Sequence, residues 1–270
     1  GISRALFELA WRCNINDTCE KLSPLFDDHT FPQDQVHFWR QPFRSIPNDE
    51  LLEDEQRRSV FDWFGNECAT FSNAVHKHRD VSTYESLRGK TPKAVAANED
   101  LQRTVQIITW KVKHGHDCGA WLDGEYTFCI ENPSSSALWD MKEMWELRAD
   151  PQVKATIIEI TQCLFGGRAI MIDGQLKGPP EKATSLLTNN PALVHYFGTA
   201  DKRWFPNAPD PKFECGKGNA CQYIGRHRVI CQDQPAKDTA AYPRSFSMQV
   251  ALLVNNWWRT AYGCKPSYCK

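Results

Sequence analysis

Long apolar runs are missing from this sequence, and so is an excess of either charge. A membrane-spanning helix needs about 18 to 20 consecutive apolar residues, and the apolar run Val250–Val254 is far shorter. The 32 basic and 33 acidic side chains nearly cancel, giving a formal net charge of −1. We therefore expect no membrane span, and a nucleic-acid partner would have to bind a local patch rather than a generally basic surface.

The sequence also lacks a regular cysteine framework. Its eleven cysteines are odd in number and irregularly spaced, unlike the paired cysteines of small secreted domains. This pattern indicates reduced thiols and an intracellular location, in the nucleus or an organelle. The chain begins at Gly1 without a methionine or an apolar signal segment, so we interpret it as a fragment or a processed chain whose targeting segment is not visible.

Strand-like and helix-like segments alternate along the chain. Apolar residues at helical spacing predict helices over residues 1–11, 91–114, 141–147 and 242–258. Runs rich in β-branched and aromatic residues predict strands over residues 60–64, 126–130 and 155–164. This alternation is typical of an α/β fold, for which we expect a mostly parallel sheet with flanking helices.

The stretch 166–238 breaks this alternation. It is rich in proline and glycine and shows no clear periodicity. We interpret it as an irregular insertion or a small subdomain. The main α/β domain would then consist of residues 1–165 and 239–270.

Two side chains with catalytic chemistry follow two of the predicted strands. Cys68 lies in a turn-like segment after 60–64, and Glu131 ends the run 126–130. The carboxyl ends of parallel strands meet at one edge of a sheet, so neighbouring strands would bring the two groups into one crevice. A thiolate there could attack an electron-poor ring carbon while the acid hydrogen-bonds a ring nitrogen. The plainer alternatives are a buried structural thiol at Cys68 and a surface or helix-capping carboxylate at Glu131.

Five segments resemble elements of the cytosine-C5 DNA methyltransferases, in the order of that family. Residues 67–74, Glu-Cys-Ala-Thr-Phe-Ser-Asn-Ala, resemble its Pro-Cys-x-x-Phe-Ser loop, and residues 130–139, Ile-Glu-Asn-Pro-Ser-Ser-Ser-Ala-Leu-Trp, resemble the Glu-Asn-Pro-x-x-Ser-x-Leu-Trp of its phage and retroelement-associated branch. Residues 162–166 with 181–189 are similar to Cys-x-Tyr/Phe-Gly followed by Lys-Pro-Thr and Asn, and residues 239–246 to Ala-x-Tyr/Phe-Pro before the last helix. Residues 1–6 resemble the tail of the glycine-rich cofactor loop.

The resemblance implies a Rossmann-like class I methyltransferase fold that transfers a methyl group from S-adenosylmethionine to a flipped-out cytosine in DNA. It implies that Cys68 adds to the ring, that Glu131 steadies the ring nitrogen, and that Asn132 shapes the loop that carries Glu131. It also implies cofactor contacts from three small residues: Gly1, Ser3 and Ser72.

A second interpretation, from a different class of protein, stays open. In it the chain is a catalytically inactive methyltransferase-fold protein that serves as a structural or RNA-binding component of a larger assembly, with RNA or protein subunits as partners. Glu67 favours this reading because it stands where the family keeps a proline, and a carboxylate beside a thiol disfavours the reactive thiolate. The presence of both Cys68 and Glu131 favours the enzyme.

The stretch 166–238 also carries the residue types of a Cys3His zinc site: Cys215, Cys221, His227 and Cys231. Their spacings are wider than the two to four residues usual between paired ligands. We therefore expect an irregular loop with incidental thiols and no metal, and keep a zinc site as the alternative.

Basic side chains gather near the end of the predicted helix 91–114: Lys111, Lys113, His114 and His116. Cations are favoured at a helix C-terminus by the helix dipole. We therefore interpret the cluster as a solvated helix end rather than a phosphate site.

Overall fold

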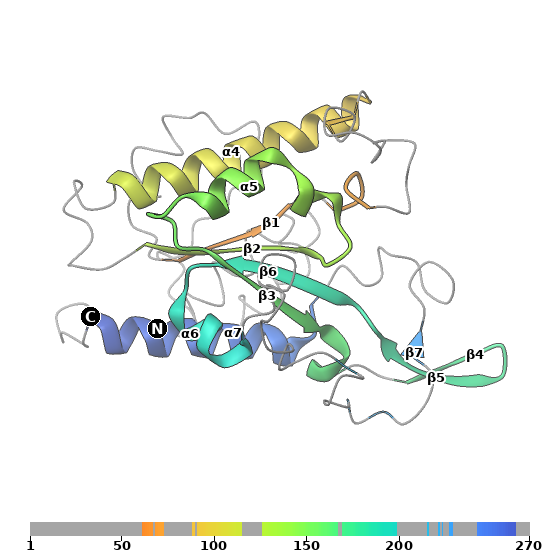
Figure 1. Ribbon diagram of the computed structural model, residues 1–270. Helices are drawn as coiled ribbons and strands as arrows, with labels where there is room; N and C mark the ends of the chain where they lie inside the picture. The colour runs from red at the N-terminus through yellow and green to blue at the C-terminus, as the bar shows by residue number, and fades with distance from the viewer. Residues whose placement is uncertain are drawn as a thin grey trace, which may run out of the picture.

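The computed structural model has an α/β architecture with two mixed sheets (Figure 1). It describes residues 61–66, 68–72, 88–89, 91–114, 126–166, 169–198, 215, 221, 223, 227–228 and 242–262. The strands of the main sheet are β1 (Phe61–Gly65), β2 (Thr127–Pro133), β3 (Thr156–Thr161) and β6 (Ala183–Thr188). A smaller sheet consists of β4 (Ile170–Ile172), β5 (Gln175–Pro180) and β7 (His227–Arg228).

The main sheet has the strand order β1-β2-β6-β3. β1 and β2 are parallel, whereas β6 is antiparallel to both of its neighbours, β2 and β3. The expectation of a mostly parallel sheet is therefore wrong for the described strands. The chain leaves β3, passes through β4 and β5, and returns as β6 between β2 and β3, which reverses its direction without a crossover helix.

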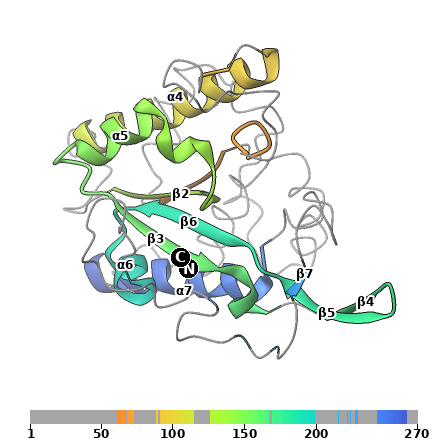
Figure 2. The same ribbon diagram turned by 45° about the vertical axis from the view of Figure 1, so that its right-hand side comes forward.

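Helices cover both faces of the main sheet (Figures 1 and 2). One face carries α4 (Pro92–His114) and α5 (Lys142–Ala149), and the other carries α6 (Pro191–Phe197) and α7 (Arg244–Tyr262). Successive residues of a strand point to opposite faces, so Phe128 and Ile130 of β2 pack in the α4–α5 core. Cys129, between them, packs in the α6–α7 core.

The predicted elements that fall within the described residues are present. The helices expected over 91–114, 141–147 and 242–258 are confirmed as α4, α5 and α7. The strands expected over 60–64 and 126–130 are confirmed as β1 and β2. The strand expected over 155–164 is confirmed as β3 only up to Thr161, because residues 162–164 lie in a short 3-10 helix. The predicted helix 1–11 lies outside the described residues. β2 continues to Pro133, so Glu131 lies inside the strand rather than after it.

Part of the stretch 166–238, expected to be an irregular insertion, is regular and belongs to the main sheet. Residues 183–188 form β6, whose burial along most of its length comes from its place between β2 and β3. α6 follows directly, with the Asn190 side chain accepting hydrogen bonds from the backbone amides of Ala192 and Leu193 as an N-cap.

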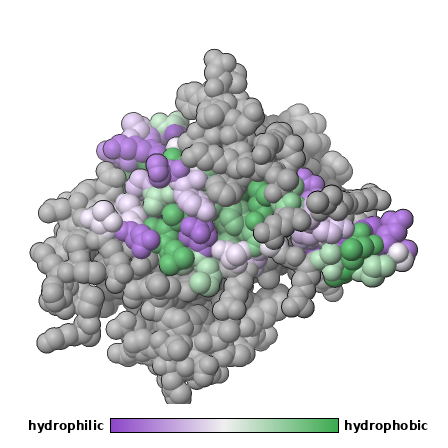
Figure 3. Space-filling model, turned by 90° about the horizontal axis from the view of Figure 1, so that it is seen from below, coloured by the Kyte–Doolittle hydropathy of each residue, from purple (hydrophilic) through white to green (hydrophobic). Residues whose placement is uncertain are grey.

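The strands β4 and β5 form a hairpin that projects from one end of the molecule (Figure 1). Its turn contains Asp173 and Gly174, both with positive φ (50° and 75°), as a tight two-residue hairpin turn requires. The hairpin exposes Ile170, Met171 and Leu176, and Figure 3 shows hydrophobic surface over this projection. Within the described residues, no helix combines the length and apolar character that crossing a membrane requires.

Candidate active site

The loop after β1 and the end of β2 lie at the same edge of the main sheet. The two strands are parallel neighbours, with Gly65 opposite Glu131. The backbone amide of Ala137 donates to the carbonyl oxygen of Phe71 (2.8 Å), and Ser72 pairs with Ser136 in an isolated bridge. From the sequence we expect the Cys68 thiol and the Glu131 carboxyl to share a crevice if the strands before them are parallel neighbours. β1 and β2 meet that condition.

Cys68 lies in a tight turn and is exposed. Its carbonyl oxygen accepts a hydrogen bond from the Phe71 amide (3.2 Å), while the side chains of Thr70 and Phe71 are buried. The buried Phe71 side chain thus anchors the turn in the protein interior, whereas Cys68 is exposed to solvent. The alternative of a buried structural thiol at Cys68 is wrong.

Glu131 is buried, with a relative exposure of 6%. Its Oε2 accepts a short hydrogen bond from the Tyr242 hydroxyl (2.6 Å), and its Oε1 lies 3.9 Å from Lys182 Nζ. Oε1 makes no hydrogen bond with any described residue. The alternative of a surface carboxylate is therefore wrong, and one oxygen of the carboxyl group is buried without a hydrogen-bond donor among the described residues.

Asn132 is fully buried and joins the ends of the two parallel strands. Its Nδ2 donates to the carbonyl oxygen of Asn66 (2.9 Å), the residue that follows β1. Asn66 in turn donates to Thr104 of α4 (3.3 Å). Because alternate strand residues face opposite sides, Asn132 belongs to the α4 side and Glu131 to the α7 side. Asn132 thus fixes the path of the backbone around Glu131.

The sequence assigned no role to two residues that hold Glu131. Tyr242 precedes α7 and packs edge-on against Trp63 (centroids 5.9 Å apart). Lys182 precedes β6, and its ammonium also lies 5.7 Å from the centre of the Tyr242 ring, within cation–π range. Both residues lie in segments that resemble methyltransferase elements. Their place within those segments is the sequence feature that could have identified them.

The remaining predicted site residues are placed less fully. Gly1 and Ser3, expected at the cofactor, and Glu67 lie outside the described residues. Ser72 is described, and its backbone pairing with Ser136 ties the Cys68 loop to the segment that follows β2. Ser136 also caps the short 3-10 helix η5 (Ala137–Asp140), which it does by accepting a hydrogen bond from Leu138. The serines after Glu131 thus include a cap, as their residue type favours.

Lys111 is not part of a solvated helix end. It is 2% exposed, and its Nζ lies 2.8 Å from Asp62 Oδ2 in a buried ion pair. The Tyr126 hydroxyl donates to the same carboxylate oxygen (2.8 Å). The interpretation as a surface cluster is therefore wrong for Lys111, which stabilises the interior between α4 and β1.

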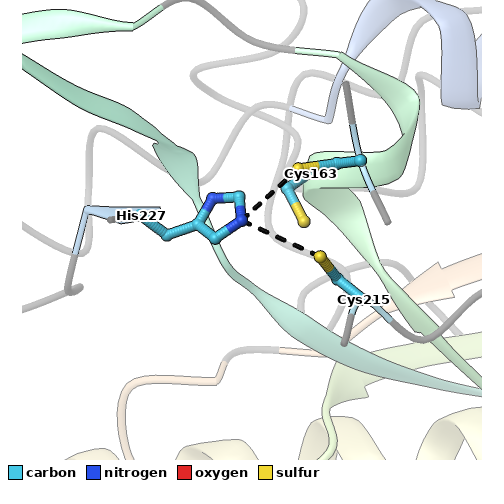
Figure 4. A group of neighbouring side chains, drawn as sticks. Cys163, Cys215 and His227 are labelled. Atoms are coloured by element: carbon cyan, nitrogen blue, oxygen red, sulfur yellow. Dashed lines mark hydrogen bonds between the residues drawn. The ribbon is translucent and has the colours of Figure 1, made fainter. Parts of the chain in front are cut away.

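A separate group of cysteine and histidine side chains lies near the end of β3 (Figure 4). Three of the residues with zinc-ligand character come together here, Cys215, Cys221 and His227, and are joined by Cys163. Cys231 lies outside the described residues. Burial, reinforced by the neighbouring Cys215 and Cys221 thiols, raises the pKa of Cys163 in the metal-free protein. These four side chains are the described residues that could hold a metal.

The chain matches no protein-family model, and neither a curated protein nor a solved structure is significantly similar to it.

Proposed function

We propose that this chain is a cytosine-C5 DNA methyltransferase with a Rossmann-like class I methyltransferase fold. The observation that carries the proposal is the pairing of β1 with β2, which puts the Cys68 loop beside the strand segment that contains Glu131. The resemblance of the same two segments to the catalytic elements of that family gives the pair its chemistry.

The chemistry assigned to Cys68 is nucleophilic addition. Carbon six of a cytosine is electron-poor, and attack by the thiolate pushes electron density to carbon five, which then takes a methyl group. S-adenosylmethionine supplies that methyl group when it is bound. A later loss of the proton from carbon five expels the thiolate and restores the ring. An exposed thiol on an anchored turn suits this role, because a flipped-out base can reach it.

The chemistry assigned to Glu131 is a hydrogen bond to N3 of the cytosine, the ring nitrogen that carries no sugar. Tyr242 occupies Oε2, which leaves Oε1 for the base. Lys182, 3.9 Å from Oε1, adds positive charge next to the site and limits the rotation of the carboxyl group. A carboxyl held this way loses little freedom when a base binds, which is the benefit of a preorganised site.

The test is covalent trapping of the full chain by a DNA duplex that contains 5-fluorocytosine, in the presence of S-adenosylmethionine. Fluorine cannot leave as a proton does, so a working thiolate stays attached to the base. We expect a stable adduct for the parent protein and none for Cys68→Ala. Cys129→Ala is the matched control, since this buried cysteine of β2 should leave the adduct unchanged.

Two results would contradict the proposal. If Cys68→Ala were trapped as well as the parent, the assigned nucleophile would be wrong. If the parent gave no adduct and calorimetric titration showed no S-adenosylmethionine binding, the catalytic assignment would fall. The non-catalytic methyltransferase-fold protein, a structural or RNA-binding component, would then be the better description.

A further inference from the structure

We propose that Cys163, Cys215, Cys221 and His227 bind one structural zinc ion. Their ligand atoms, three sulfurs and one ring nitrogen, all lie within 4.8 Å of one another. Figure 4 shows the side chains of Cys163, Cys215 and His227 pointing toward a common centre. Three thiolates and an imidazole form a recognised tetrahedral zinc donor set.

The spacing of the donor atoms fits a tetrahedral ion. A zinc–sulfur distance of about 2.3 Å and a zinc–nitrogen distance of about 2.0 Å separate neighbouring ligand atoms by roughly 3.5 to 3.8 Å. The His227 Nε2 lies 3.4 Å from the Cys221 sulfur and 3.8 Å from the Cys215 sulfur. Only small side-chain shifts are needed for all four atoms to contact one ion.

The tautomer of His227 is set for metal binding. Its Nδ1 lies 2.8 Å from the carbonyl oxygen of Pro179, where only a protonated Nδ1 makes a hydrogen bond. Nε2 is then the nitrogen with a lone pair, and Nε2 is the atom that faces the sulfurs. A backbone carbonyl that orients the distal nitrogen is the usual outer-shell partner of a zinc-bound histidine.

The four residues come from separated parts of the chain that other contacts already hold in place. Cys163 lies in the short 3-10 helix η6 (Gln162–Phe165) directly after β3. The Cys215 amide donates to the Thr161 hydroxyl (3.1 Å), which docks that residue on the end of β3. His227 begins β7 and pairs with Gly178 of β5. The ion would therefore join β3, β5 and β7.

All four coordination positions are filled by protein atoms, so the ion is structural and has no position for a substrate. Binding would displace the protons of the three thiols and leave a complex with one net negative charge. The site also adjoins the candidate active site: the Gln162 amide, next to Cys163, donates to the carbonyl oxygen of Lys182 (3.0 Å). The ion would thereby steady the backbone that carries the cation beside Glu131.

The test is the metal content of the full chain after exchange into zinc-containing buffer and removal of unbound metal. We expect about one zinc per chain by mass spectrometry of the metals, and thiolate-to-metal charge-transfer absorption after replacement by cobalt. Cys163→Ser and Cys221→Ser should each weaken zinc binding by more than about 100-fold, because even outer-shell changes cost 10- to 100-fold. Cys68→Ser, at an exposed cysteine outside the cluster, should keep the zinc.

Cys221→His separates loss of a ligand from loss of folding, since histidine also binds zinc. We expect this variant to retain the ion and to shift its cobalt spectrum. The variant Cys231→Ser tests which cysteine is the fourth ligand: Cys163, as the structure indicates, or Cys231, as the sequence suggests. The assignment is overturned if the folded parent binds no zinc, or if Cys231→Ser loses the zinc while Cys163→Ser keeps it.

Discussion

Lys111 and Asp62 form an ion pair in which both side chains are buried. The carboxylate accepts hydrogen bonds from both the Lys111 ammonium and the Tyr126 hydroxyl, and the ammonium also lies 4.8 Å from the centre of the Tyr126 ring. Taking two charges out of water is costly unless each finds partners. The three side chains therefore depend on one another, and removing one leaves the others poorly solvated.

We expect Lys111→Met to lower the free energy of unfolding by about 3 to 5 kcal/mol, because it strands the Asp62 carboxylate in the core. The double variant Asp62→Asn/Lys111→Met should recover part of that loss. Urea unfolding measures both. Lys113→Met is the matched control: its ion pair with Asp150 is long (3.6 Å) and the lysine is exposed, so it should cost less than about 1 kcal/mol. Equal losses for the two lysines would contradict the buried pair.

The hydroxyl of Tyr242 is expected to matter through Glu131. Tyr242→Phe keeps the ring contacts with Trp63 and Phe246 but removes the 2.6 Å hydrogen bond. We expect a loss of about 1 to 3 kcal/mol in unfolding free energy, since a buried carboxyl oxygen loses its donor. In a double-mutant cycle, Tyr242→Phe should cost much less in a Glu131→Gln background. Additive effects would show that the two side chains are not coupled.

At the scale of elements, Gly178 of β5 packs closely against Tyr223, near the Cys163, Cys215, Cys221 and His227 side chains. A β-carbon added there would lie 2.2 Å from Tyr223 Cδ1, closer than atoms can approach. The Tyr223 hydroxyl donates to the carbonyl oxygen of Leu176 (2.9 Å), and Arg228 Nε donates to that of Gly178 (2.9 Å). Tyr223, His227 and Arg228 are therefore all held in place by contacts with β5.

Gly178→Ala should displace the Tyr223 ring and weaken zinc binding. We expect a destabilisation of about 1 to 3 kcal/mol from overpacking, measured by urea unfolding together with the zinc content. If the clash is the cause, Gly178→Ala should add little when Tyr223 is already alanine. Gly174→Ala serves as the comparison: no atom lies near an added β-carbon there, so its cost comes from the positive φ alone and should be the same with either residue at position 223.

Sequence patterns predicted the elements that have a clear local pattern, such as helical periodicity or an apolar run. α4 shows helical periodicity over its whole length, and the apolar runs around Phe61 and Phe128 are buried strands. β6 was missed because Pro179 and Pro180 precede it and its partners are remote: Leu187 pairs with both Ile130 and Ile157. Its insertion between β2 and β3 depends on long-range pairing, which no local pattern reports.

In the candidate site, too, local sequence patterns predicted some of the residues, and long-range contacts determine the others. Cys68 and Glu131 could be related from sequence because each follows a run predicted to be a strand, and parallel strand ends converge. The contact of Tyr242 with Glu131 spans 111 residues, and the place of Cys163 beside Cys215 depends on how the chain returns after β6. Such contacts are set by tertiary packing. Cys163 was therefore left out of the expected ligand set, although its residue type allowed it.

At the scale of the whole molecule, the main sheet and the smaller sheet are stabilised differently. The α4–α5 side is a continuous apolar core that contains fully buried Leu101, Ile108 and Phe128. The smaller sheet has short strands and exposed apolar residues at its hairpin. A small sheet with little core needs another source of stability, and a metal ion would provide it.

We therefore expect a strong chelator to act unevenly on the molecule. Removing zinc should lower the melting temperature, and added zinc should restore it, because the ion binds the folded state only. Hydrogen exchange should accelerate in β5 and β7 while α4 keeps its protection. Uniform acceleration would mean that the ion supports the entire fold, and an unchanged exchange pattern would argue against a structural ion.

The place of β6 also bears on how the protein is made. β2 and β3 are translated well before β6, yet they run in the same direction and neither pairs with the other without it. A chain emerging from the ribosome therefore carries two apolar strands with open edges until residue 188 has left the exit tunnel. β1 and β2 can pair early, but β3 can join the described sheet only after β6 is made, and a truncation before Ala183 would release a polypeptide prone to pair with its own copies.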